Sequence, residues 1–213
     1  MLRRADVLLA TCEAEKGWIE RYLGPHCPPV EVTDIKRFFK LGSGGVESGG
    51  VGELSAVKNS QLITHDSQLH LLYLGRHHPL KGLEFLEEAV RQISSDPHSP
   101  FPVPPQLKVV SNAFGEEKEK VWDWCDALVL PTLSENFGRV VAEALERGKR
   151  VITTDGAPAW ESECKMESVK CKVGDGEIWF GYDGRLIYLK GYRDGSPDER
   201  VRLLKDAIEK LQM

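Results

Sequence analysis

Two cations stand at a boundary between a predicted strand and a predicted helix. Arg76 and Lys81 lie in YLGRHHPLKGL, between an apolar run and a helical pattern. A cation at the start of a helix is unfavourable, because that end already carries partial positive charge. A phosphate bound between the two cations and the free helix amides would reverse the sign of that interaction. The alternative is a pair of surface cations, with the lysine stem packed over Leu83 or Phe85.

Two acids stand at a similar boundary further along the chain. Glu135 and Glu143 lie in LSENFGRVVAEAL, separated by seven residues. Glu135 is expected at a strand-to-helix turn, near Gly138, which lets a ligand approach the backbone. Glu143 is expected about two turns into the helix. Taken singly, Glu135 can be a solvated first-turn acid, and Glu143 can be the i,i+4 partner of Arg147.

Other candidate groups favour simpler interpretations. His77 and His78 are adjacent in a predicted loop and need not face the same way, which favours solvated side chains over metal ligands. The glycine- and serine-rich segment 41–55 contains no phosphate-binding loop motif and is typical of a linker. The five cysteines form no CxxC pair, which favours a reducing compartment over disulfides or a zinc site.

Strand and helix patterns alternate along most of the chain. Strands are expected within residues 5–12, 28–33, 68–76, 107–115, 126–132 and 149–156. Helices are expected over 13–23, 81–93, 116–125 and 134–148. The strands are continuously apolar, as parallel strands covered on both faces are. The fold class is therefore predicted to be α/β, with a doubly wound parallel sheet whose carboxyl edge binds ligands.

The carboxyl-terminal part of the sequence is less regular. Residues 177–192 predict a small hairpin with its turn at Asp183–Gly184. A final helix is predicted over 196–211, with Ser196 as N-cap, Pro197 at the first helical position and Glu199 completing a capping box.

The composition excludes several classes of protein. The chain has 213 residues, of which 41% are hydrophobic, and a net charge of −5. No basic block stands out, so nucleic-acid binding is not expected. No apolar run is long enough to span a membrane. We expect a cytoplasmic protein, either free or attached peripherally at the inner face of the membrane.

Four ordered elements together resemble a known family. They are the strand and Gly-Arg followed by Lys-Gly in LLYLGRHHPLKGLEFL, the strand DALVLPT, the Glu-x7-Glu motif with Phe-Gly, and the strand VITT. This combination resembles the donor-binding half of family 4 retaining glycosyltransferases of the GT-B type. The stretches SENFGRVVAEAL and TTDGAPAW look most like bacterial lipopolysaccharide-core and related cell-surface sugar transferases.

The resemblance implies a role for each candidate residue. Arg76 and Lys81 would bind the diphosphate of a UDP-, GDP- or ADP-sugar, and Glu143 would hold the ribose hydroxyls. The donor sugar would be held by Glu135 and by backbone amides of the next three residues, Asn136, Phe137 and Gly138. No cofactor or metal is expected, because these cations and amides could stabilise the charge that develops on the leaving diphosphate. Whether retention uses a glycosyl-enzyme or same-face attack stays open.

The resemblance also implies a division of the chain. Residues 1–40 would be a strand-helix-strand remnant of the acceptor domain, 41–67 a linker, and 68–213 the Rossmann-like donor domain. Most of the acceptor domain has no counterpart in this sequence, so the resemblance implies that a partner subunit or a second copy could supply it. The acceptor itself would be a saccharide or a glycolipid. The alternatives are a non-catalytic nucleotide-sugar-binding module that complements a separate subunit, or an unrelated sugar-phosphate enzyme of the same fold class.

Overall fold

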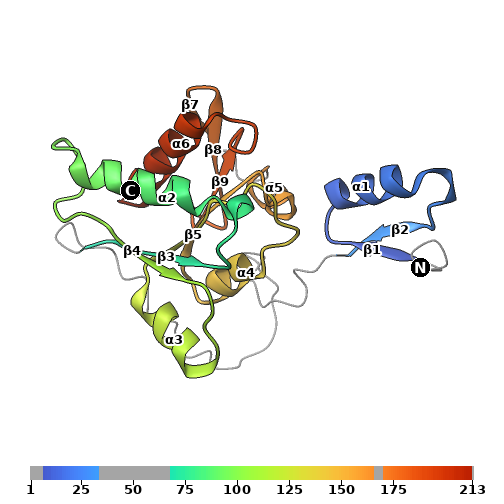
Figure 1. Ribbon diagram of the computed structural model, residues 1–213, viewed down its shortest axis with the longest axis horizontal. Helices are drawn as coiled ribbons and strands as arrows, with labels where there is room; N and C mark the ends of the chain where they lie inside the picture. Colours follow the sequence, from blue (N-terminus) through green and yellow to red (C-terminus); the bar gives the residue numbers. More distant parts are fainter. Residues whose placement is uncertain (1–6, 34–67, 166–169, 213) are drawn as a thin grey trace, which may run out of the picture.

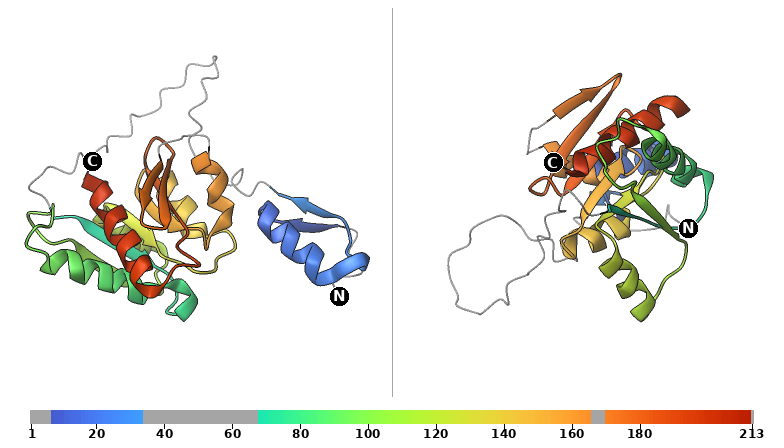
Figure 2. Two further views of the ribbon diagram at one scale, coloured as in Figure 1. Left: turned by 90° about the horizontal axis from the view of Figure 1, so that it is seen from above. Right: turned by 90° about the vertical axis from the view of Figure 1, so that its left-hand side faces the viewer.

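The computed structural model describes residues 7–33, 68–165 and 170–212. The predicted linker 41–67 lies outside the described residues. Residues 68–165 and 170–212 build a sheet with helices on both faces, and residues 7–33 form a small unit beside α5 (Figures 1 and 2).

The main sheet has seven strands in the order β4-β3-β5-β6-β9-β8-β7. The first five pair in parallel, and β8 and β7 extend the sheet in antiparallel fashion. The strands are β3 (His70–Leu74), β4 (Gln106–Val110), β5 (Ala127–Leu130), β6 (Arg150–Thr154), β7 (Lys170–Val173), β8 (Gly176–Gly181) and β9 (Leu186–Lys190). The predicted doubly wound α/β sheet is confirmed.

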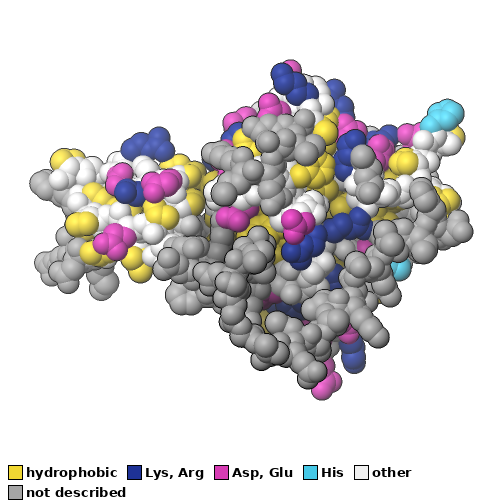
Figure 3. All heavy atoms as spheres, turned by 180° about the vertical axis from the view of Figure 1, so that it is seen from behind, with side chains coloured by type: hydrophobic (Ala, Val, Ile, Leu, Met, Phe, Trp, Pro, Cys, Tyr) yellow, Lys and Arg dark blue, Asp and Glu magenta, His cyan; other side chains and the backbone are white. Residues whose placement is uncertain are grey.

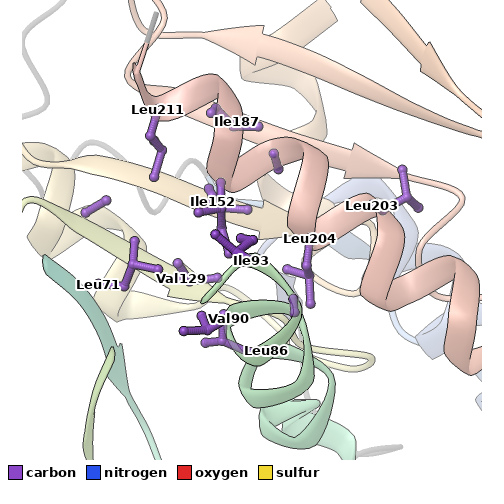
Figure 4. Close-up of a cluster of buried hydrophobic side chains, with 14 of the residues drawn as sticks. Leu71, Leu86, Val90, Ile93, Val129, Ile152, Ile187, Leu203, Leu204 and Leu211 are labelled. Carbon is purple, nitrogen blue, oxygen red and sulfur yellow. The ribbon is translucent and has the colours of Figure 1, made fainter. Parts of the chain in front are cut away.

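Helices cover both faces of the sheet, which explains why its strands are continuously apolar. Alternate residues of one strand enter different cores, since successive side chains point to opposite faces: Leu71 and Tyr73 enter one, Leu72 and Leu74 the other. The first core lies under α2 (Leu83–Ser95) and α6 (Pro197–Glu209), as Figure 4 shows. The second lies under α3 (Gly115–Trp124), α4 (Arg139–Glu146) and α5 (Glu161–Lys165).

The helix expected over 134–148 begins later than predicted. α4 starts at Arg139, after Gly138 in a left-handed conformation with φ of 69°. Glu135 is therefore a loop residue between strand and helix, as predicted, and the alternative of a first-turn acid is wrong. Glu143 lies only one turn into the helix. The loop forms because its backbone bonds to neighbouring segments: the amide of Glu135 donates to the carbonyl of Gly156 at 2.8 Å.

The predicted hairpin forms, and it also belongs to the main sheet. β8 and β9 pair in antiparallel fashion, and the turn between them has positive φ at Tyr182, Asp183 and Gly184. β9 then pairs in parallel with β6 on its other side. The hairpin therefore supplies the fifth parallel strand, which its local sequence pattern does not indicate.

The amino-terminal unit has the strand-helix-strand order that the sequence predicts. It contains β1 (Leu8–Ala10), α1 (Glu13–Leu23) and β2 (Val30–Val32), with β1 and β2 parallel. Figure 3 shows hydrophobic side chains on the surface of this unit, where five large ones are exposed: Val7, Leu9, Trp18, Tyr22 and Val32. Its origin as a remnant of an acceptor domain stays a prediction.

The capping box of α6 gives a direct test of local stability. The hydroxyl of Ser196 accepts from the amide of Glu199, and the carboxylate of Glu199 accepts from the amide of Ser196. Ser196→Ala should lower the free energy of unfolding by about 1 kcal/mol and Tm by about 2–4 °C, measured by thermal denaturation. Ser111→Ala, in an exposed loop, is the control and should leave Tm unchanged.

The same box gives a pH dependence of known sign. The hydrogen bonds from Ser196 lower the pKa of Glu199. The stabilisation is therefore fully present above the ordinary pKa of glutamate and is lost as the pH falls through the lowered value. The stability difference between the wild type and Glu199→Ala should narrow in acid, and a difference that stays constant down to that range would contradict this assignment.

Candidate functional site

The carboxyl edge of the parallel sheet gathers loops that are distant in sequence. The amide of Leu133, after β5, donates to the carbonyl of Leu80, after β3, at 2.8 Å. The amide of Glu135 in turn donates to Gly156, after β6. Three strand-to-helix loops are thus bonded into one platform, at the edge where ligands bind in folds of this class.

Two glycines permit the close approach of these loops. A Cβ atom on Gly82 would lie 2.2 Å from the carbonyl oxygen of Pro131, and one on Gly156 would lie 2.1 Å from that of Thr132. Gly82 also has φ of 62° and separates Lys81 from the start of α2. Any larger residue would force the loops apart, so both glycines are required by the platform itself.

The centre of the platform is an ion pair between Lys81 and Glu135, which are 54 positions apart in sequence. Their side chains are only 16% and 25% exposed. The lysine Nζ contacts Oε2 of the glutamate, and Oε1 accepts from the amide of Asn136 at 3.1 Å. Lys81 is therefore not a free surface cation. It lies beside the acid that the resemblance assigns to the donor sugar.

Arg76 lies in the same β3–α2 loop as Lys81, and its side chain is exposed. Its backbone carbonyl accepts from the hydroxyl of Tyr73 at 2.9 Å. Burial, followed by the negative charges of Glu84 and Glu135, raises the pKa of Tyr73 to about 12. The hydroxyl therefore stays protonated and donates its hydrogen bond across the physiological range.

The neighbouring histidines lie on the surface, as predicted. His77 and His78 are both exposed, and Nδ1 of His78 accepts from the amide of Leu80 at 3.2 Å. Both line an open hollow of about 410 Å³ beside the platform. Within the described ranges, no group of three or more histidine, cysteine or acidic side chains could hold a metal ion.

Glu143 has a different partner from the one the sequence suggests. Its Oε2 lies 2.6 Å from Nζ of Lys118, in the first turn of α3. Arg147 instead pairs with Glu119 at 2.7 Å and donates only to the backbone carbonyl of Glu143. The alternative of a Glu143–Arg147 ion pair is therefore wrong, because the side chain of Arg147 reaches Glu119 of α3. The sequence contains the feature that could have identified Lys118. It is a cation in the first turn of a helix, the same criterion that selected Lys81.

Trp160 and Asp155 also support the platform. Neither was predicted as a site residue, although both lie in the stretch TTDGAPAW. Trp160 is fully buried, and its indole Nε1 donates to the carbonyl of Phe137 at 2.5 Å. The ring of Phe137, also buried, lies 5.2 Å from that of Trp160. Asp155 accepts from the amides of Gly191 and Arg193, each at 2.8 Å, and thereby ties the loop after β6 to the loop after β9. Burial raises the pKa of this carboxyl.

The described helices include none long and apolar enough to cross a membrane. The sequence matches no known family model and no curated protein.

Solved structures, in contrast, share the fold. Two similar structures are a GtfA/B complex, with a TM-score of 0.52 and 14% identity, and the pneumococcal O-GlcNAc transferase GtfA in complex with UDP and GlcNAc, with 0.54 and 14%. Each match covers 97% of this chain and 38% of the other. TarM matches with a TM-score of 0.51 and 12% identity, over 99% of this chain and 39% of its own. The described chain thus has the fold of part of a GT-B glycosyltransferase, as the sequence motifs predicted.

Proposed function

We propose that this chain binds a nucleoside diphosphate sugar at the carboxyl edge of its sheet and takes part in glycosyl transfer. The observation that carries the proposal is the Lys81–Glu135 pair, in which a cation that could bind phosphate lies beside an acid that could accept hydrogen bonds from sugar hydroxyls. Arg76 is exposed in the loop that bears Lys81. One of the similar structures is a complex with UDP and GlcNAc, which agrees with this ligand class.

The proposed chemistry is stabilisation of the leaving group by charge. The bond between the sugar and the diphosphate breaks, and negative charge grows on the departing phosphate oxygen. The sugar carbon bonds to an acceptor hydroxyl oxygen, whose proton passes to the departing phosphate or to water. Lys81, which is mostly buried, and the exposed Arg76 would stabilise that charge, and the fixed position of Lys81 would keep the cost of reorganisation low. A bound diphosphate that attracts Lys81 would also weaken the ion pair between Lys81 and Glu135. The carboxylate of Glu135 could then accept a hydrogen bond from a hydroxyl of the sugar.

Finer assignments follow from the sequence motifs and remain proposals. They are membership of family 4, retention of configuration, a saccharide or glycolipid acceptor, a role in bacterial cell-surface polysaccharides, and a cytoplasmic location. A second candidate function is a donor-binding module that needs a partner subunit for activity. One similar structure is a GtfA/B complex, which agrees with a partner subunit. The chain spans 38% of the length of two of the similar structures.

Calorimetric titration with UDP, GDP, ADP and their sugars tests the proposal and separates the two candidates. Binding accompanied by donor hydrolysis or transfer supports an enzyme, whereas binding without turnover supports the module. Wild-type protein that binds none of these ligands contradicts the donor site.

The ribose role proposed for Glu143 has a specific signature. If its carboxylate accepts from the ribose hydroxyls, the wild type should bind a ribonucleoside diphosphate at least tenfold more tightly than its 2′-deoxy analogue, because a charge-assisted hydrogen bond is worth about 1.5–3 kcal/mol. Glu143→Ala should remove most of that preference. Glu119→Ala, the control, alters a neighbouring acid paired with Arg147 and should retain it. Equal preference in the wild type and Glu143→Ala would exclude the role.

A further inference from the structure

The amino-terminal unit reaches the loop that carries Glu135. Oγ1 of Thr11, at the end of β1, lies 2.7 Å from Oδ1 of Asn136. The same hydroxyl lies 2.7 Å from Oε2 of Glu15, which also accepts the amide of Thr11 at 2.6 Å. Glu15 therefore fixes the position of Thr11 through its backbone amide. The single hydrogen of the Thr11 hydroxyl is shared between Oε2 of Glu15 and Oδ1 of Asn136, which lies 125 positions away in sequence.

Other contacts hold the unit in the same place. Cys12 packs against the second core, and the guanidinium of Arg193 lies 5.8 Å from the ring centre of Trp18. α1 also contacts η5 (Pro158–Trp160). η5 supplies the indole that donates to the carbonyl of Phe137, so the unit packs against a segment that supports the loop 134–138. The side-by-side position of the unit and α5 is visible in Figures 1 and 2.

These contacts form one continuous chain from the unit to the ion pair. Thr11 contacts the side chain of Asn136, and the backbone N–H of Asn136 donates to the carboxylate of Glu135. Glu135 in turn pairs with Lys81. A loop fixed at Asn136 presents Glu135 and the adjacent amides in one arrangement. A loop released at that point must be ordered by the ligand itself, which weakens binding.

We propose that Thr11 is a positioning residue that sets how strongly the site recognises the sugar part of its donor. The inference rests on the proposed function, which assigns sugar recognition to the loop 134–138 and diphosphate recognition to Lys81 and Arg76. Among the described residues, the Thr11 hydroxyl meets the first of these segments directly and reaches Lys81 only through it. Its removal should therefore reduce affinity for the nucleotide sugar and spare affinity for the nucleoside diphosphate alone.

The test compares two ligands in three variants. Thr11→Val keeps the shape of the side chain and removes the hydroxyl, whereas Thr11→Ser keeps the hydroxyl. Thr33→Val is the matched control, because Thr33 follows β2 as Thr11 follows β1. For the nucleotide that the wild type binds, titration gives Kd for the diphosphate and for its sugar. The preference for the sugar-bearing ligand should fall about fivefold in Thr11→Val, the effect of one ordinary hydrogen bond. It should be unchanged in Thr11→Ser and Thr33→Val.

Hydrogen exchange gives a second readout that needs no ligand. The amide of Glu135, bonded to Gly156, should exchange faster in Thr11→Val than in the wild type or Thr11→Ser. An unchanged exchange rate overturns the proposal, as does an equal loss of affinity for both ligands. A wild type that binds no nucleotide refutes the proposed donor site and the recognition role together, and the exchange result then separately decides whether the contact holds the loop.

Discussion

Lys81→Ala should weaken the binding of nucleoside diphosphate at least tenfold. The lysine is mostly buried, and its Nζ is positioned by Glu135 at the platform edge. A charge-assisted hydrogen bond to phosphate contributes about 1.5–3 kcal/mol, and each 1.4 kcal/mol is a factor of about ten in Kd. The variant also leaves the Glu135 carboxylate without its cation, and repulsion between this acid and the phosphates adds to the loss. Isothermal titration of both proteins measures the difference.

Two companion variants separate the cation from its surroundings. Lys205→Ala removes another paired lysine, which lies 2.8 Å from Asp96 after the far end of α2, and should leave binding unchanged. Glu135→Gln should leave diphosphate affinity equal or higher, because Lys81 no longer has to give up an ion pair, while affinity for the nucleotide sugar falls. Unchanged diphosphate binding in Lys81→Ala would exclude the lysine from the site.

Trp160→Ala should lower the free energy of unfolding by about 3–5 kcal/mol, which is among the largest costs expected for a single substitution here. The side chain is fully buried, it packs against Phe137, and its indole holds the backbone of the loop that carries Glu135. Urea denaturation followed by circular dichroism measures the change. We expect the loss of stability to be accompanied by weaker nucleotide-sugar binding, since the loop loses its support.

A milder pair of variants isolates the hydrogen bond from the cavity. Trp160→Phe keeps most of the buried ring and leaves the carbonyl of Phe137 without its donor, which should cost about 1–3 kcal/mol. Trp122→Phe is the control: Trp122 is equally buried, and its Nε1 has no hydrogen-bond partner among the described residues. A larger loss in Trp122→Phe than in Trp160→Phe would contradict the role assigned to this bond.

The sequence predicted those elements whose causes are local. α1 spans Glu13–Leu23 as expected, and α6 starts at Pro197 behind the predicted N-cap. The continuous apolar strands indicated a sheet covered on both faces, because each residue must be buried on one face or the other. Chain order alone also implied that residues after parallel strands meet at one edge.

Where the prediction failed, the cause was a contact with a distant segment. α4 begins at Arg139 because the preceding loop bonds to Gly156 and Trp160, and the helical pattern of 134–148 carries no trace of those partners. Glu143 pairs with Lys118 because α3 lies beside α4, whereas spacing along one helix suggested Arg147. The parallel pairing of β9 with β6 is likewise a matter of sheet order.

The sequence by itself determined the class of fold and most of its elements, and it suggested which residues could contact a phosphate or a sugar. Only the tertiary structure decided which of them meet. It pairs Lys81 with Glu135, joins the loops through Gly82 and Gly156, and brings Thr11 to Asn136. The physical reason is that periodicity and capping act over a few residues, while an ion pair between side chains 54 positions apart depends on how the whole sheet is ordered.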